Sequence, residues 1–118
     1  MNTNVHFAGM DSTDALNQYA RDRAEDLTTY FDGITGIDVH IGRESQHHQK
    51  GKVFFAEFKV QIPNQPPVVV KKDSDDLYKA MDKVKDHMKI ELEKIKGKMN
   101  QIDREVLSEQ KAYHPDDD

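Results

Sequence analysis

The sequence predicts an α+β fold, a two-layer sandwich with the element order β-α-β-β-β-α. Apolar and polar residues alternate in four short segments, as they do in half-buried strands. Two longer segments repeat apolar residues at helical spacing, and one of them separates the first two strands. We therefore expect a four-stranded mixed sheet with two helices packed on one face, opened by a right-handed parallel crossover.

The first strand and first helix are expected within residues 4–31. Val5 and Phe7 alternate with polar or small neighbours, and a turn over residues 9–12 follows. Asp11, Ser12 or Thr13 can cap the helix by accepting its free N–H groups. From residue 14 on, the apolar residues at helical spacing are Leu16, Ala20, Ala24, Leu27 and Phe31. Asp-Gly at 32–33 is expected to end the helix.

Three strands and a long helix are expected next. The strands are predicted over residues 37–41, 54–62 and 68–72, with a polar loop over 42–52 and a proline-containing turn over 63–67. Asp73 and Ser74 are expected to cap a helix that begins near Asp75. Its apolar face carries Leu77, Met81, Val84, Met88, Leu92, Ile95 and Met99.

Residues 1–99 are expected to form one domain, and residues 100–118 a C-terminal tail. The chain has 118 residues, a length typical of one domain. Ile102 and Val106 continue the apolar stripe of the last helix, so a helical extension is expected before a disordered end rich in aspartate. The chain has no cysteine, which fits a reducing cytosol, and we expect a cytoplasmic protein with no membrane partner.

The sequence predicts no enzyme and no bound cofactor. It contains no nucleophile elbow, glycine-rich phosphate loop or dinucleotide-binding fingerprint. Of its six histidines, His47 and His48 are adjacent, and His6 and His40 fall on the outward side of two strands. Neither pair has the spacing of a helical zinc motif. We therefore expect no catalytic residues, no metal site and no small-molecule substrate.

Charge along the last helix is uneven. The formal net charge is −5, yet residues 77–99 hold seven Lys against four Asp or Glu. On a helical wheel at about 100° per residue, one flank collects Lys79, Lys83, His87, Lys94 and Lys98. Ile90 interrupts this flank, and the opposite flank mixes lysines with acidic residues. A row of ammonium groups suits a phosphate backbone. The same row also fits lysines that only solvate an exposed flank.

The first helix adds a second candidate contact. Tyr19, Arg23 and Tyr30 lie along one edge of its apolar stripe. An arginine between aromatic rings can stack on a base and reach a phosphate. Alternatively, both tyrosines pack at the margin of the core and Arg23 extends over them.

Three segments resemble one family. They are Tyr30-Phe31-Asp32 at the end of the first helix, the strand Ile37-Asp-Val-His-Ile41, and Asp76-Leu-Tyr-Lys-Ala-Met-Asp82 opening the last helix. In this order the sequence resembles the ribosome hibernation-promoting factors, which include the ribosome-associated inhibitor proteins and are also called sigma-54 modulation proteins. The likeness covers roughly residues 3–99, and the chain is similar to the short forms of the family.

The resemblance implies binding to 16S ribosomal RNA in the decoding region of the small ribosomal subunit. Family members use basic side chains of both helices, and His87, Lys94 and Lys98 match such positions. Arg23 stands where the family usually has lysine. The sequence departs from the family at Ile90, usually arginine, and at Asp26, usually lysine; Lys79 and Lys83 supply charge on the same flank.

The predicted function is therefore a translation inhibitor, a ribosome hibernation factor that blocks the transfer-RNA and messenger sites. Its expected RNA-binding residues are Arg23, Lys79, Lys83, His87, Lys94 and Lys98. We expect a monomer off the ribosome. The alternative is a protein-interaction module, in which the extended last helix dimerises or binds a partner protein.

Overall fold

The computed structural model describes residues 2–44 and 53–108, with side chains up to residue 98. Its elements are β1 (Asn2–Ala8), α1 (Asp14–Leu27), β2 (Gly36–Arg43), β3 (Phe54–Gln61), β4 (Val68–Ser74) and α2 (Leu77–Ser108). This order confirms the predicted β-α-β-β-β-α arrangement.

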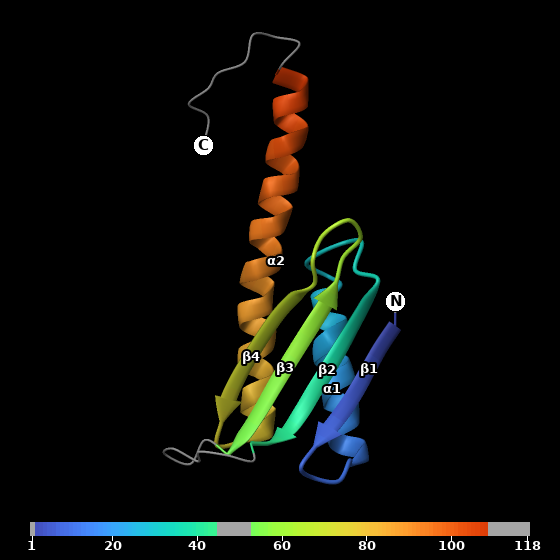
Figure 1. Cartoon of the computed structure of the whole chain (residues 1–118), viewed down its shortest axis with the longest axis vertical. Helices are drawn as coiled ribbons and strands as arrows, with labels where there is room; N and C mark the ends of the chain where they lie inside the picture. Colours follow the sequence, from blue (N-terminus) through green and yellow to red (C-terminus); the bar gives the residue numbers. More distant parts are fainter. Residues whose placement is uncertain (1, 45–52, 109–118) are drawn as a thin grey trace.

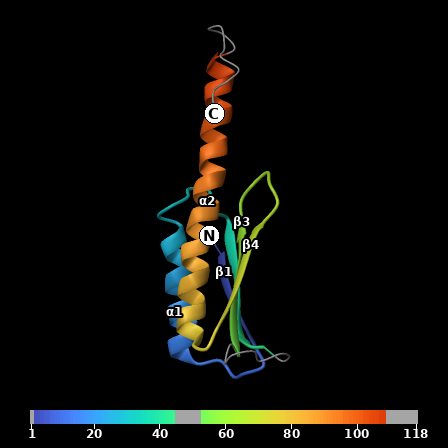
Figure 2. The ribbon, with the colours of Figure 1, turned by 90° about the vertical axis from the view of Figure 1, so that its left-hand side faces the viewer.

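The sheet is mixed, as predicted, and its strand order is β1-β2-β3-β4. β1 pairs with β2 in parallel, and β2–β3 and β3–β4 are antiparallel. α1 makes the crossover that a parallel pair requires. Both helices lie on one face of the sheet (Figures 1 and 2), so the molecule has two layers and an open sheet face.

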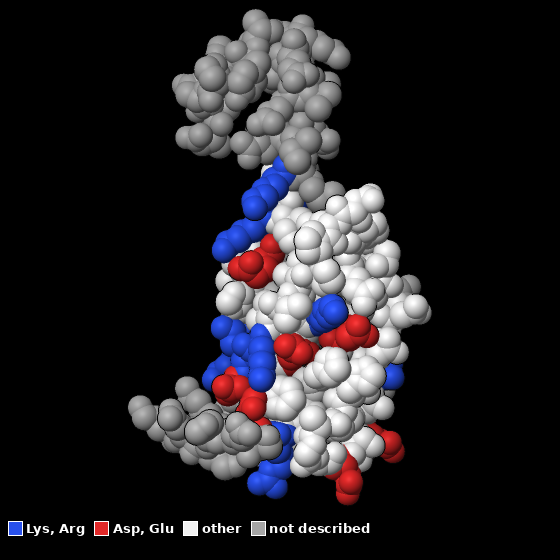
Figure 3. All heavy atoms as spheres, in the orientation of Figure 1, with Lys and Arg blue, Asp and Glu red and all other residues white. Residues whose placement is uncertain are grey.

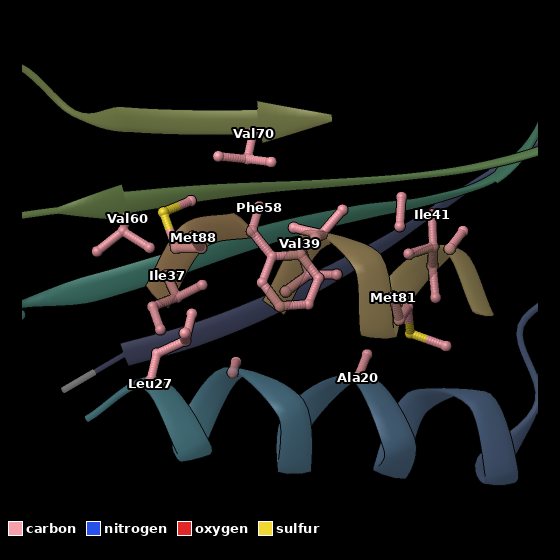
Figure 4. Packing of buried hydrophobic residues seen from close by; sticks show 14 of the residues in the cluster. Ala20, Leu27, Ile37, Val39, Ile41, Phe58, Val60, Val70, Met81 and Met88 are labelled. Carbon is pink, nitrogen blue, oxygen red and sulfur yellow. The ribbon is translucent and has the colours of Figure 1, made fainter. Parts of the chain in front are cut away.

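The core lies between the sheet and the two helices. On the inner face of the central strands, Val39 pairs with Phe58 and Ile41 with Ala56, and all four are fully buried. Figure 4 shows the Phe58 ring among side chains from the sheet and from α2, above α1. α1 meets this layer through two alanines and two leucines, its buried side chains being Leu16, Ala20, Ala24 and Leu27. The alternation in the sequence thus selected the buried face correctly.

α1 ends at Leu27, four residues before the predicted end at Phe31. The hydroxyl of Thr28 donates to the Glu25 carbonyl at 2.7 Å, and that of Thr29 to the Asp26 carbonyl at 2.7 Å. The backbone N–H groups of residues 28–30 likewise reach carbonyls only three residues back, the tighter pattern of a last turn. Phe31 is still buried, but it comes from the turn after the helix.

Other boundaries also differ from expectation. Asp76 caps α2, because its carboxylate accepts from the Tyr78 N–H at 2.8 Å. Ser74 is instead the buried last residue of β4, so the predicted cap over 73–74 is wrong. β2 runs to Arg43, past the predicted end at residue 41, and pairs Gly42 with Ala8. A Cβ at Gly42 would overlap the Ala8 carbonyl, so this pairing requires glycine. Most of the predicted loop, residues 45–52, lies outside the described residues.

α2 is much longer than the sheet it covers. Its last fully buried side chain is Leu92, and Ile95 packs only partly against the core. The helix continues to Ser108 and projects beyond the sheet (Figure 1). No helix within residues 2–44 and 53–108 has the length and apolar character needed to cross a membrane. The predicted disordered end falls outside the described residues.

Candidate nucleic-acid interface

The two flanks of α2 face different neighbours. On one flank, the Lys83 ammonium lies 3.4 Å from the backbone carbonyl oxygen of Asp73 in β4. On the other, the Asp82 carboxylate accepts from the Tyr19 hydroxyl of α1 at 2.6 Å. The sequence pattern defined both flanks, and the structure shows that one borders β4 and the other borders α1.

The predicted row of basic residues lies on the flank that borders β4. We call it the α2 stripe, and its members are Lys79, Lys83, His87, Lys94 and Lys98. With a rise of about 1.5 Å per residue, the stripe extends for roughly 28 Å. Figure 3 shows basic side chains gathered along the margin where α2 and β4 lie, broken by acidic ones. The structure thus brings five of the six predicted residues into one line.

Acidic neighbours neutralise the stripe only in part. The Glu91 carboxylate lies 3.5 Å from His87 Nε2 and 3.3 Å from Lys94 Nζ, and so serves two members. Lys79 Nζ is 4.0 Å from Asp75. The side chains of these pairs are 33–66% exposed, and pairs in contact with solvent contribute little, about 0–1 kcal/mol each. A phosphate can therefore replace the carboxylates at small cost.

Arg23, the sixth predicted residue, is not next to the stripe. It lies on the α1–α2 seam, the contact line between the helices, with its guanidinium 4.8 Å from the centre of the Tyr19 ring. Its Nε is 3.2 Å from the Asp26 carboxylate, an ion pair without a hydrogen bond among the described residues. The resemblance leads us to expect lysine at position 26. The Asp26 carboxylate found there offsets the charge of Arg23.

The helical wheel placed Lys85 and Lys89 on the opposite, mixed flank without assigning them a contact, and sequence reasoning missed the basic residues of β4. On the seam, Lys89 lies 4.5 Å from the centre of the Tyr30 ring, and Lys85 is one turn earlier on α2. On the other side, Lys71 and Lys72 of β4 border the stripe. The adjacent lysines Lys71 and Lys72 are visible in the sequence as a basic pair. Its relevance depended on the placement of β4 beside α2, which periodicity does not reveal.

The Tyr19–Asp82 hydrogen bond ties α1 to α2 at the seam. The bond, burial and the Asp82 charge raise the pKa of Tyr19 above its usual 10.0. Since the folded state holds this proton more tightly than the unfolded chain, the contact stabilises the fold below pH 10.0 and loses this effect as the pH rises through the raised pKa.

Replacing Asp82 by asparagine is expected to lower the pKa of Tyr19 towards its usual value, because the main source of the shift loses its charge. The pH dependence of the Tyr19 Cζ resonance measures this. Asp22→Asn is the matched control, since among the described side chains Asp22 accepts a hydrogen bond from Gln18 alone, on the exposed side of α1. An equal shift in both variants would contradict the assignment.

The histidines form no candidate metal site among the described residues. His6 and His40 stack at 4.7 Å on the open sheet face, yet no group of three His, Asp or Glu within residues 2–44 and 53–98 is placed to hold a metal ion. His47 and His48 fall outside these residues. Ile90, where the resemblance leads us to expect arginine, is 54% exposed and supplies an apolar surface beside the stripe.

The fold and the stripe define a small α+β domain with a basic helical flank, a class of surface suited to a nucleic-acid backbone. The chain belongs to the family described as sigma 54 modulation protein / S30EA ribosomal protein, whose model matches residues 3–100.

Two of the solved structures that match this chain show the same fold. A ribosomal subunit interface protein from Coxiella burnetii superposes with a TM-score of 0.70 at 22% identity, covering 82% of this chain and 99% of that one. The N-terminal domain of Protein Y from Thermus thermophilus gives a TM-score of 0.66 at 26% identity, covering 80% and 99%. Together with the family match, these structures confirm the predicted family and fold.

Proposed function

We propose that this chain is a ribosome hibernation factor, which binds the small ribosomal subunit in its decoding region and blocks the transfer-RNA and messenger sites. Two findings support ribosome binding: membership of the S30EA family, and the fold shared with a ribosomal subunit interface protein. The α2 stripe is the observation that carries the proposal, because it concentrates positive charge in a chain of net charge −5.

The mechanism is steric and electrostatic. The stripe neutralises phosphates of 16S ribosomal RNA and releases their counterions, which gives affinity without reading sequence. The rest of the domain then occupies the space that transfer RNA and messenger need. We assign this binding to residues 1–99, with 100–118 as a tail, and propose a cytoplasmic monomer without enzymatic chemistry.

Co-sedimentation with purified subunits tests the proposal. The protein is expected to pellet with small subunits and not with large ones, and prior occupancy should reduce binding of transfer RNA and messenger. Equal recovery with both subunits would contradict the choice of partner. Undiminished transfer-RNA binding at saturation would contradict the steric block.

A second candidate function rests on the length of α2. The helix runs to Ser108, well past the last fully buried residue at Leu92, and this projection offers a surface for a partner protein or a second copy. Truncation after Met99, followed by light scattering and ribosome sedimentation, separates the two functions. Loss of dimers with ribosome binding intact would assign the projection to self-association. Loss of ribosome binding would place part of the ribosome-binding surface in residues 100–118.

A further inference from the structure

An open groove runs between β4 and the stripe side of α2. Its volume is about 660 Å³. Its charged and polar lining comes from Lys71, Lys72, Asp73, Lys83, Asp86 and His87. An edge strand and the helix that follows it therefore present cations to the same space.

Lys72 is the cation that β4 adds. It lies on the same face of the strand as the buried Val70 and Ser74, which is the face that the helices cover. Lys72 is only partly buried and lines the groove beside α2. Among the described side chains Lys72 makes no ion pair, whereas Lys83 across the groove contacts only the Asp73 backbone carbonyl.

Lys71 plays a different part in the same groove. Its ammonium is held by Glu44 at 2.9 Å and lies 4.8 Å from the centre of the Phe55 ring. The hydrogen bond to Glu44 raises the pKa of Lys71, although burial opposes the shift. The Lys71 ammonium is thus already engaged by Glu44 and Phe55, on the open face of the sheet.

The acidic residues of the groove leave it with a net positive charge. Asp86 lies 3.8 Å from Lys85 and has a side chain 75% exposed, so its charge is shared with a lysine on the seam side and with solvent. Lys72 and Lys83 remain against the single carboxylate of Asp73, while His87 Nε2 lies 3.5 Å from Glu91, which a phosphate would have to displace. Two ammonium groups on separate elements fix the position of an anion better than one flexible side chain does.

We infer that this groove holds one phosphate of the RNA backbone, between Lys72 of β4 and Lys83 of α2, with His87 as a further donor. The inference rests on the proposed function and deepens it, because it adds a strand residue to a contact otherwise made by the helix. The half-exposed Ile90 at the rim offers an apolar surface to the adjoining sugar.

Lys72→Gln tests the assignment, with Lys59→Gln as the matched control. Both substitutions remove one charge from a strand, but Lys59 is exposed on β3, where it pairs with Asp38 on the open sheet face. Affinity for small subunits is measured across a salt series, and circular dichroism checks that both variants fold.

Lys72→Gln is expected to weaken binding roughly five- to eightfold at 0.1 M salt and to make the log–log salt slope less negative by about 0.7–0.9, the effect of one phosphate contact. Lys59→Gln should leave both quantities unchanged. Equal behaviour of the two variants, while the wild type binds, would overturn the inference and leave the proposed function intact. Failure of the wild type to bind would overturn the function itself.

A titration with inorganic phosphate tests whether the groove binds a phosphate of RNA or a free phosphate ion. Titrated into the free protein, it is expected to move the Lys83 and His87 amide resonances weakly and without saturation. Tight, saturable binding of inorganic phosphate would reassign the groove to a free anion and overturn the inference.

Discussion

The double reversal Lys83→Glu with Lys94→Glu is expected to weaken binding to small ribosomal subunits by more than about 25-fold at 0.1 M salt. Each lost phosphate contact accounts for at least roughly fivefold, and each new carboxylate adds repulsion. Lys94 has a side chain 64% exposed and Lys83 is also exposed, so the fold should be unaffected. Fluorescence anisotropy with a labelled protein measures the affinity.

The matched control is Lys59→Glu with Arg43→Glu. It makes the same change in net charge on exposed residues of the open sheet face and the end of β2. If binding depends on the stripe, this control should lose little affinity. An equal loss in both double variants would show that net charge alone governs binding, and it would contradict the role of the stripe.

Phe58→Ala is expected to lower the free energy of unfolding by about 4 kcal/mol, because it removes a large side chain from a packed core and leaves a cavity. Phe58 is fully buried on the central strand β3 and is paired with Val39 and Val70 (Figure 4). Urea denaturation measures the loss. For a domain of this size such a loss is a large share of total stability.

Phe55→Ala is the control for the core. Phe55 lies three residues earlier on β3, on the open sheet face against Lys71, and is only partly buried. Its removal should cost about 1 kcal/mol or less, the worth of an exposed cation–aromatic contact. Equal losses at positions 55 and 58 would contradict the assignment of the two sheet faces.

The fold could be predicted because its periodic patterns are long. The alternation over residues 54–62 and the helical stripe beyond Leu77 each depend on many residues, so no single one decides the outcome. Boundaries depend on single contacts instead. α1 ends early because the hydroxyls of Thr28 and Thr29 bond to backbone carbonyls, and the capping role falls to Asp76 because Ser74 is used in β4. Periodicity contains no information about such contacts.

The candidate site was predicted as far as one helix can define it. Spacing alone placed five basic residues on one flank of α2. It could not orient that flank towards β4, because orientation depends on tertiary packing. Arg23 was predicted as a separate contact from the first helix, or as a side chain that extends over the tyrosines, and the structure places it over the Tyr19 ring on the seam, beside Asp26. Lys72 was missed because its role depends on the packing of a strand edge against α2.

The most direct test is the salt dependence of wild-type binding to small ribosomal subunits, measured between 50 and 200 mM monovalent salt. If four or five members of the α2 stripe neutralise phosphates, the log–log slope should be about −3 to −4.5. Affinity would then fall by roughly 60- to 500-fold over this fourfold range of salt. A slope near zero, with binding retained, would contradict an interface built on the lysines of α2.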